Sequence, residues 1–191
     1  MNRHTQAGLT LVELVVTLTV VAILASVAAP SLRDMLTSNR LTAANNQLVS
    51  TINYARAEAV KRVYNVVLCV RNSDGSDCTS NSGDSYENGW IVFVDCNTNS
   101  TPDTATNVCD TNGDGVSDAP EAILADTKPN LTSGMTIVGS SGLEQKIGYK
   151  PNGNASKSGN LVLNMDGSAY YQITIAANTG RLSSCKVGST C

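Results

Sequence analysis

The stretch QAGLTLVELVVTLTVVAILASVAAPSL, residues 6–32, decides how the chain is built. No charged side chain occurs between residues 14 and 29, and residues 9–30 have roughly the 20-residue length of a helix that crosses a bilayer. One carboxylate, Glu13, lies near the start. A charge inside a membrane-length segment costs roughly a few kcal/mol, so Glu13 needs a partner or a purpose.

A secretory signal peptide is the alternative interpretation, with SVAAP at residues 26–30 as its cleavage site. Two observations favour a retained helix instead. Glu13 lies inside the apolar region, and the helical pattern continues past Pro30. Apolar residues there recur at spacings of three and four, at Leu41, Ala44, Leu48, Ile52, Ala55 and Ala59. We predict a membrane half at residues 9–30 and an amphipathic half at residues 31–64, bent near Pro30 because proline removes a backbone donor.

The cysteine content indicates an oxidising compartment. None of the six cysteines forms a C-x-x-C pair, and the chain has a single histidine, which disfavours a zinc site. An even number of cysteines in a Gly- and Asn-rich region favours three disulfides over reduced, buried thiols in a cytosolic domain. Pairing neighbours in sequence gives Cys69–Cys78, Cys96–Cys109 and Cys185–Cys191.

Residues 65–191 are predicted to form a β-rich head. Strands are expected at YNVVLCV (64–70), GWIVFVD (89–95), AILAD (122–126), MTIVG (135–139), KIGYK (146–150), NLVLN (160–164), YYQITIAA (170–177) and GRLSS (180–184). Hairpin-type turns separate the later strands, at residues 151–153, 166–167 and 178–180. The fold class is therefore α+β, a long helix packed on an antiparallel sheet.

The residues Gly8-Leu9-Thr10-Leu11-Val12-Glu13 resemble the class III signal of type IV pilins and type II secretion pseudopilins. This resemblance implies that a prepilin peptidase removes residues 1–8 by cutting after Gly8, and that Leu9 is then N-methylated. Leu9 departs from the phenylalanine usual at that position. Glu13 matches the glutamate at the fifth mature residue, and the amine of a neighbouring subunit's Leu9 would offset its charge. The alternative is that Glu13 reaches the membrane surface on its own.

The head adds to the resemblance. The long helix, NGWIVFVD, an acidic loop, AILAD and a terminal TGR strand resemble the group of H-type minor pseudopilins and FimT-like minor pilins. The group implies a single-pass inner-membrane protein with a periplasmic head, which then enters a filament at or near its tip. Implied partners are other minor and major subunits, the peptidase and the inner-membrane assembly platform. Type II secretion and type IV pili both use this architecture, and both remain open.

The segment DTNGDGVSDAPE, residues 110–121, matches the calcium-loop spacing. Its oxygen donors would be Asp110, Asn112, Asp114, the Val116 carbonyl, Asp118 and Glu121. Flanking helices are not evident, so a solvated turn without metal is the alternative interpretation. No other cofactor is required by the sequence.

The sequence bears on two further functions, DNA binding and catalysis. TGRLSSCK, residues 179–186, resembles part of a C-terminal Gly-Arg-x-Arg motif with which some minor pilins bind DNA, and Arg181 and Lys186 would be the contacting residues. The second arginine is Ser183, and the chain is acidic, with a net charge of -3, so this function is the weaker alternative. Catalysis is not expected, because the only histidine, His4, lies in the leader.

Overall fold

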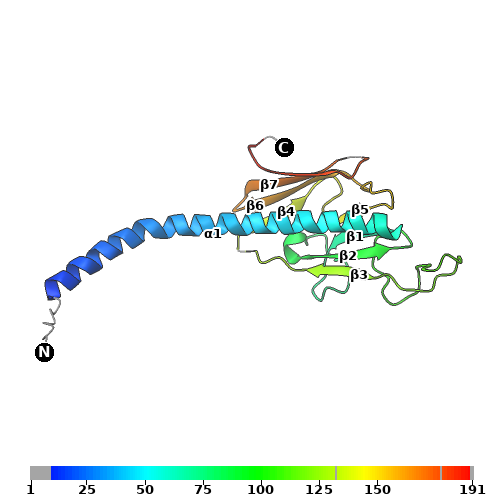
Figure 1. Ribbon diagram of the computed structural model, residues 1–191, viewed down its shortest axis with the longest axis horizontal. Helices are drawn as coiled ribbons and strands as arrows, with labels where there is room; N and C mark the ends of the chain where they lie inside the picture. Colours follow the sequence, from blue (N-terminus) through cyan, green and yellow to red (C-terminus); the bar gives the residue numbers. More distant parts are fainter. Residues whose placement is uncertain (1–9, 132, 177, 190–191) are drawn as a thin grey trace, which may run out of the picture. The chain divides into compact units, whose positions relative to one another are not determined.

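The computed structural model describes residues 10–131, 133–176 and 178–189. The chain divides into two compact units, one ending at Asn39 and one beginning at Arg40. Helix α1, Leu11–Arg62, runs through both, as the amphipathic pattern predicted (Figure 1). The helix ends because Val63 adopts a left-handed backbone with φ 62°, a conformation that a β-branched residue rarely takes.

Within the described residues, the strands all belong to the second unit. They are β1 (Asn65–Val70), β2 (Trp90–Asp95), β3 (Ile123–Thr127), β4 (Met135–Gly139), β5 (Lys146–Tyr149), β6 (Gly159–Met165), β7 (Ser168–Ile175) and β8 (Leu182–Lys186), with a short 3-10 helix η1 (Tyr86–Asn88) before β2. Each predicted strand is present. The turn between β6 and β7 is Asp166-Gly167, with both φ angles positive, as a two-residue hairpin requires.

The strands form two four-stranded sheets rather than one. The first has the order β3-β2-β1-β5 and the second the order β4-β6-β7-β8, and the neighbouring strands in both are antiparallel. This confirms the α+β class with antiparallel strands and corrects the expectation of a single sheet.

Both sheets and the second half of α1 share one core. Side chains of β1 alternate, so that Val66, Leu68 and Val70 enter this core while Val67 and Cys69 face a smaller cluster on the other side of the first sheet. Residues from β4, β5, β6 and β7 complete the main core. The first sheet is thereby covered on both faces, which explains why all six residues of β2 are buried.

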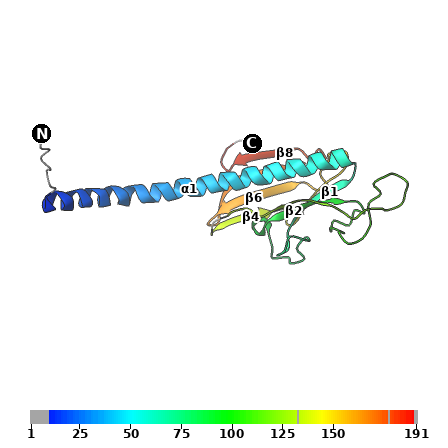
Figure 2. The ribbon, with the colours of Figure 1, turned by 60° about the horizontal axis from the view of Figure 1, so that its bottom comes forward.

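The buried face of α1 is the one that the spacing predicted. Leu41, Ala44, Leu48, Ile52, Ala55 and Ala59 are each at most 4% exposed. Polar contacts fix the helix on the second sheet: Ser184 Oγ of β8 donates to Asn45 Oδ1 at 2.9 Å, and Thr42 Oγ1 lies 2.9 Å from Tyr171 Oη of β7. Figure 2 shows β8 beside this part of α1.

Candidate assembly site

The start of α1 is built around Glu13. Thr10 precedes the first helical residue, and its Oγ1 accepts a hydrogen bond from the Glu13 backbone N–H at 3.2 Å. Thr10 and Glu13 therefore have the spacing of a capping box, in which the hydroxyl satisfies a backbone donor that the helix itself leaves free. The carboxylate also lies in the first turn, where the helix dipole favours negative charge.

The first unit presents apolar side chains on all sides. An 18-residue window of α1 has a mean hydropathy of 2.5 and no buried residue. The large apolar residues there are 49–79% exposed, namely Leu11, Val12, Leu14, Val15, Val16, Leu18, Val20, Val21, Ile23, Leu24, Val27, Leu32, Met35 and Leu36. A helix that is apolar all round is suited to lipid or to neighbouring helices, not to water.

Three hydroxyl side chains of this segment are satisfied within the helix. The hydroxyls of Thr17, Thr19 and Ser26 donate to the carbonyls three residues earlier, at 2.9, 2.8 and 2.7 Å. Hydroxyls bonded in this way add little cost in hydrocarbon. Glu13 is thus the one side chain between residues 10 and 32 that carries a charge.

The predicted assembly site also includes Gly8, Leu9 and Pro30. Gly8 and Leu9, the predicted cleavage and methylation positions, lie outside the described residues, as does His4. The helix continues through Pro30 without a break. The bend expected at Pro30 stays a prediction.

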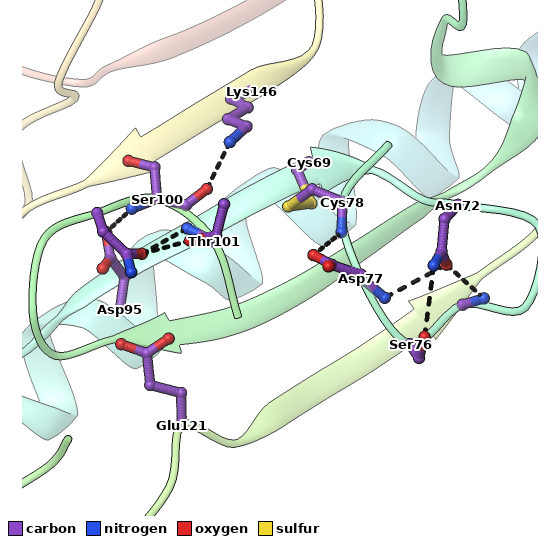
Figure 3. The surroundings of a disulfide bond; sticks show 12 residues. Cys69, Asn72, Ser76, Asp77, Cys78, Asp95, Ser100, Thr101, Glu121 and Lys146 are labelled. Carbon is purple, nitrogen blue, oxygen red and sulfur yellow. Dashed lines mark hydrogen bonds between the residues drawn. A yellow bond between two sulfur atoms is a disulfide. The ribbon is translucent and has the colours of Figure 1, made fainter. Parts of the chain in front are cut away.

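Two of the three expected disulfides are present. Cys69 pairs with Cys78 and Cys96 with Cys109. Figure 3 shows the first, which joins β1 to the loop after it; the Cys78 N–H also donates to Asp77 Oδ1 at 2.6 Å. Cys185 is disulfide-bonded as well, and its expected partner Cys191 lies outside the described residues. Disulfides persist in oxidising compartments, and the bridges agree with the oxidising compartment that the cysteine content predicted.

The predicted calcium loop is arranged differently from the sequence pattern. Asp110 accepts hydrogen bonds from the backbone N–H groups of Gly113 and Gly115, at 2.6 and 2.8 Å, and these bonds hold the pKa of its carboxyl below the usual value. Asp118 accepts from Thr111 at 2.9 Å. The loop is thus closed by its own donors.

Glu121, which was expected to complete that loop, does not join it. Its carboxylate accepts the N–H groups of Cys96 at 2.7 Å and Asp103 at 3.0 Å, in the preceding loop. Within the described ranges, no group of three or more His, Cys, Asp or Glu side chains is positioned to hold a metal ion. Of the expected calcium ligands, Asp110, Asn112, Asp114, Val116 and Asp118 remain in this loop, which lacks the bidentate carboxylate that closes a calcium loop.

The predicted DNA contacts lie at opposite ends of β8. Arg181 precedes the strand and Lys186 ends it, and both are exposed. Five residue steps at about 3.3 Å each separate them by roughly 17 Å, and the odd number of steps puts them on opposite faces of a regular strand. These two cations therefore do not form one phosphate-binding surface.

Comparison with known proteins agrees with this architecture. Residues 44–180 match the family described as Type II transport protein GspH, and residues 3–29 match the prokaryotic N-terminal methylation motif. The chain belongs to the GspH family. The match to the methylation motif includes Gly8, Leu9 and Glu13, the residues that carried the resemblance in the sequence. No curated protein matches the chain.

Among solved structures, the type IV minor pilin FimU of Pseudomonas aeruginosa strain PAO1 is similar in fold, with a TM-score of 0.50 and 16% sequence identity. The similarity covers 76% of the present chain and 88% of the FimU chain. At this identity the likeness concerns the fold alone, the long helix packed on antiparallel sheets. The GspH family consists of structural subunits, which confirms the expectation that this chain is not an enzyme.

Sequence reasoning missed one feature of this GspH-family head. The buried carboxylates Asp95 and Glu121, each 2% exposed, both hold the loop that follows β2. The signal that could have found Asp95 was its position at the end of an entirely apolar strand, where a charged side chain is rarely buried without a role.

Proposed function

We propose that this chain is a minor pseudopilin, made as a prepilin, cleaved between Gly8 and Leu9, N-methylated, and incorporated at or near the tip of a periplasmic filament. The carrying observation is the uncovered apolar part of α1, where Glu13 is the single carboxylate between residues 10 and 32. Membership of the GspH family favours a type II secretion pseudopilus as that filament.

The physical role of Glu13 follows from its position. Transfer of a lone carboxylate into hydrocarbon costs roughly a few kcal/mol. A helix inserted beside a subunit whose terminal amine lies at the same depth avoids most of that cost. The charge therefore favours insertion next to a partner and fixes the axial register between the two helices. Other pseudopilins are the partners, and the inner-membrane platform is where insertion takes place.

Processing is the first step to test. The full chain is expressed with and without a prepilin peptidase, and the N-terminus is measured by mass spectrometry. We expect a methylated Leu9 terminus only with the peptidase, and an intact leader in Gly8→Ala. A product cut after Ala29 would show a secretory signal peptide and would refute the proposal.

The tip position needs its own measurement. Gold-labelled antibody against the head, applied to sheared filaments, is expected to mark filament ends. Labelling distributed along the filament length would refute the tip position while leaving the subunit role intact.

A further inference from the structure

The loop after β2 contains a second segment with the oxygen-donor spacing of a calcium loop. Asp95, Asn97, Asn99 and Asp103 occupy the first, third, fifth and ninth positions, as Asp110, Asn112, Asp114 and Asp118 do fifteen residues later. At the sixth position, where calcium loops turn sharply, Ser100 has a φ of 61° and Gly115 a φ of 85°. The chain therefore carries these four donor positions twice, while the first loop has Ser100 in place of the glycine and Thr106 in place of the closing glutamate.

Asp95 distinguishes the first loop from the second. Its side chain is buried, and Oδ1 has no hydrogen-bond partner among the described residues. Its other oxygen, Oδ2, accepts the Ser100 N–H at 3.2 Å, so the carboxylate is turned into the loop (Figure 3). A buried carboxylate oxygen without a partner is costly, and a bound cation would remove that cost.

Further oxygen donors approach the same loop from its other parts. Glu121, equally buried, accepts the N–H groups of Cys96 and Asp103, which holds its carboxylate against the loop from the β3 side. The amides of Asn97 and Asn99 both donate to Asp103 Oδ2, at 2.6 and 2.8 Å. The side chains of Asn97, Asn99 and Asp103 thus lie together.

The charge balance of this loop is negative. Three carboxylates, Asp95, Asp103 and Glu121, are opposed by Lys146, whose Nζ donates to the Ser100 carbonyl at 2.6 Å. The lysine contacts the loop backbone, as Figure 3 shows, and leaves Asp95 Oδ1 without a partner. Carboxylate, amide and carbonyl oxygens on a flexible loop are the ligands of calcium, because magnesium demands a stricter octahedral geometry.

We propose that this loop binds one calcium ion. Asp95, Asn97, Asn99, the Thr101 carbonyl and Glu121 supply oxygens, and Asp103 binds directly or through water. Acidic side chains alone do not form a three-residue cluster in the described ranges; amide and carbonyl oxygens complete the set. The two loops differ in one respect: Asp95 has a buried carboxylate oxygen without a hydrogen-bond partner, whereas the Asp110 carboxylate is exposed and both of its oxygens accept backbone N–H groups.

The repeated pattern supplies a matched control. Full-length protein in detergent is stripped of metal with a chelator, then titrated with calcium or magnesium by calorimetry and followed by thermal unfolding. We expect saturable calcium binding to one site and a higher Tm with calcium than with magnesium. Asp95→Asn should weaken calcium binding by about tenfold or more, as loss of a ligand exceeds typical losses from its supporting groups. Asp110→Asn, the same change in the other loop, should bind calcium like the wild type.

Asp103→Asn serves as a second variant in case Asp95→Asn fails to fold. The Asp103 side chain is partly exposed and the substitution preserves its size, so this variant should fold. It should weaken calcium binding as well. The proposal is overturned by no calcium binding in the wild type, by weakening in Asp110→Asn but not in Asp95→Asn or Asp103→Asn, or by equal affinity for magnesium.

Discussion

The two halves of helix α1 have the same backbone and opposite surroundings. Between Leu11 and Leu36 every large apolar side chain is at least 49% exposed, whereas the apolar face between Leu41 and Ala59 is at most 4% exposed. The second half has one apolar stripe because it meets one head, and the first half is apolar all round because it must meet lipid or several helices. The distribution of apolar residues around a helix therefore tells what covers it.

The largest expected effect concerns the charge in the first half. Glu13→Gln removes the charge and keeps the shape, so cleavage after Gly8 should proceed while recovery in the filament fraction falls about tenfold or more, since a few kcal/mol of register energy is lost. Glu13→Asp keeps the charge and should assemble partially. Unchanged recovery of the Gln variant, measured by immunoblotting sheared filaments, would show that the carboxylate has no role in assembly.

A leucine-to-alanine substitution should destabilise the head when it is made in the second half of α1, and should leave the stability of the head unchanged when it is made in the first half. Leu48→Ala removes a buried side chain from the core and should reduce the free energy of unfolding of the head by about 2–5 kcal/mol. Leu24→Ala, in the exposed half, should leave it unchanged. Urea unfolding in detergent, followed by the fluorescence of the buried Trp90, measures both; equal losses would contradict the division of the helix.

Loss of the hydrogen bonds that join the second half of α1 to the head should reduce the free energy of unfolding by a smaller amount. Arg56 donates from Nε to the Gly153 carbonyl and from Nη2 to the Thr179 carbonyl, both at 2.9 Å, which ties α1 to two turns of the head. Arg56→Met should cost about 1–3 kcal/mol in the same unfolding assay, because two carbonyls lose a charged donor. Arg40→Met, on the exposed surface of the same helix, should cost less than about 0.5 kcal/mol.

The smallest expected effect on stability comes from the ionisation of Glu58, near the end of α1. The hydrogen bond from Arg62 Nε at 2.6 Å, with a lesser contribution from Lys61, lowers the pKa of Glu58. A carboxylate with a lowered folded-state pKa stabilises the protein above its unfolded pKa, and this stability is lost as pH falls through the folded pKa. Glu58→Gln should reduce stability at pH 7 by about 0.5 kcal/mol and should make no difference at pH 2. A deficit that persists at pH 2 would assign the loss to packing.

Sequence alone was sufficient for the elements but not for their arrangement. Every expected strand is present within a few residues, because β-branched runs between Gly, Asn and Pro turns are local signals. The division into two sheets was missed, since β5 returns to pair with β1 over a long separation, as Val66 opposite Tyr149 shows. Only tertiary packing determines that pairing.

The same distinction applies to the sites. Gly8, Leu9 and Glu13 form a contiguous motif and could be found by reading the chain. Glu121 could not be assigned from spacing, because the pairing of β2 with β3 directs its carboxylate to the loop after Asp95. Spacing places Glu121 at the twelfth position of the loop that begins at Asp110, and only the folded chain shows its carboxylate bonded to the loop after Asp95.

The Cys96–Cys109 disulfide lies next to Asp95 and joins the start of the long β2–β3 connection to its middle. The strands on either side of this connection are held together by backbone hydrogen bonds that involve no sulfur atom. A subunit whose head had not yet crossed the inner membrane would lack this disulfide, while the backbone groups of its strands would still be able to pair. The covalent state of one loop would then report whether export had taken place before the subunit joined its neighbours.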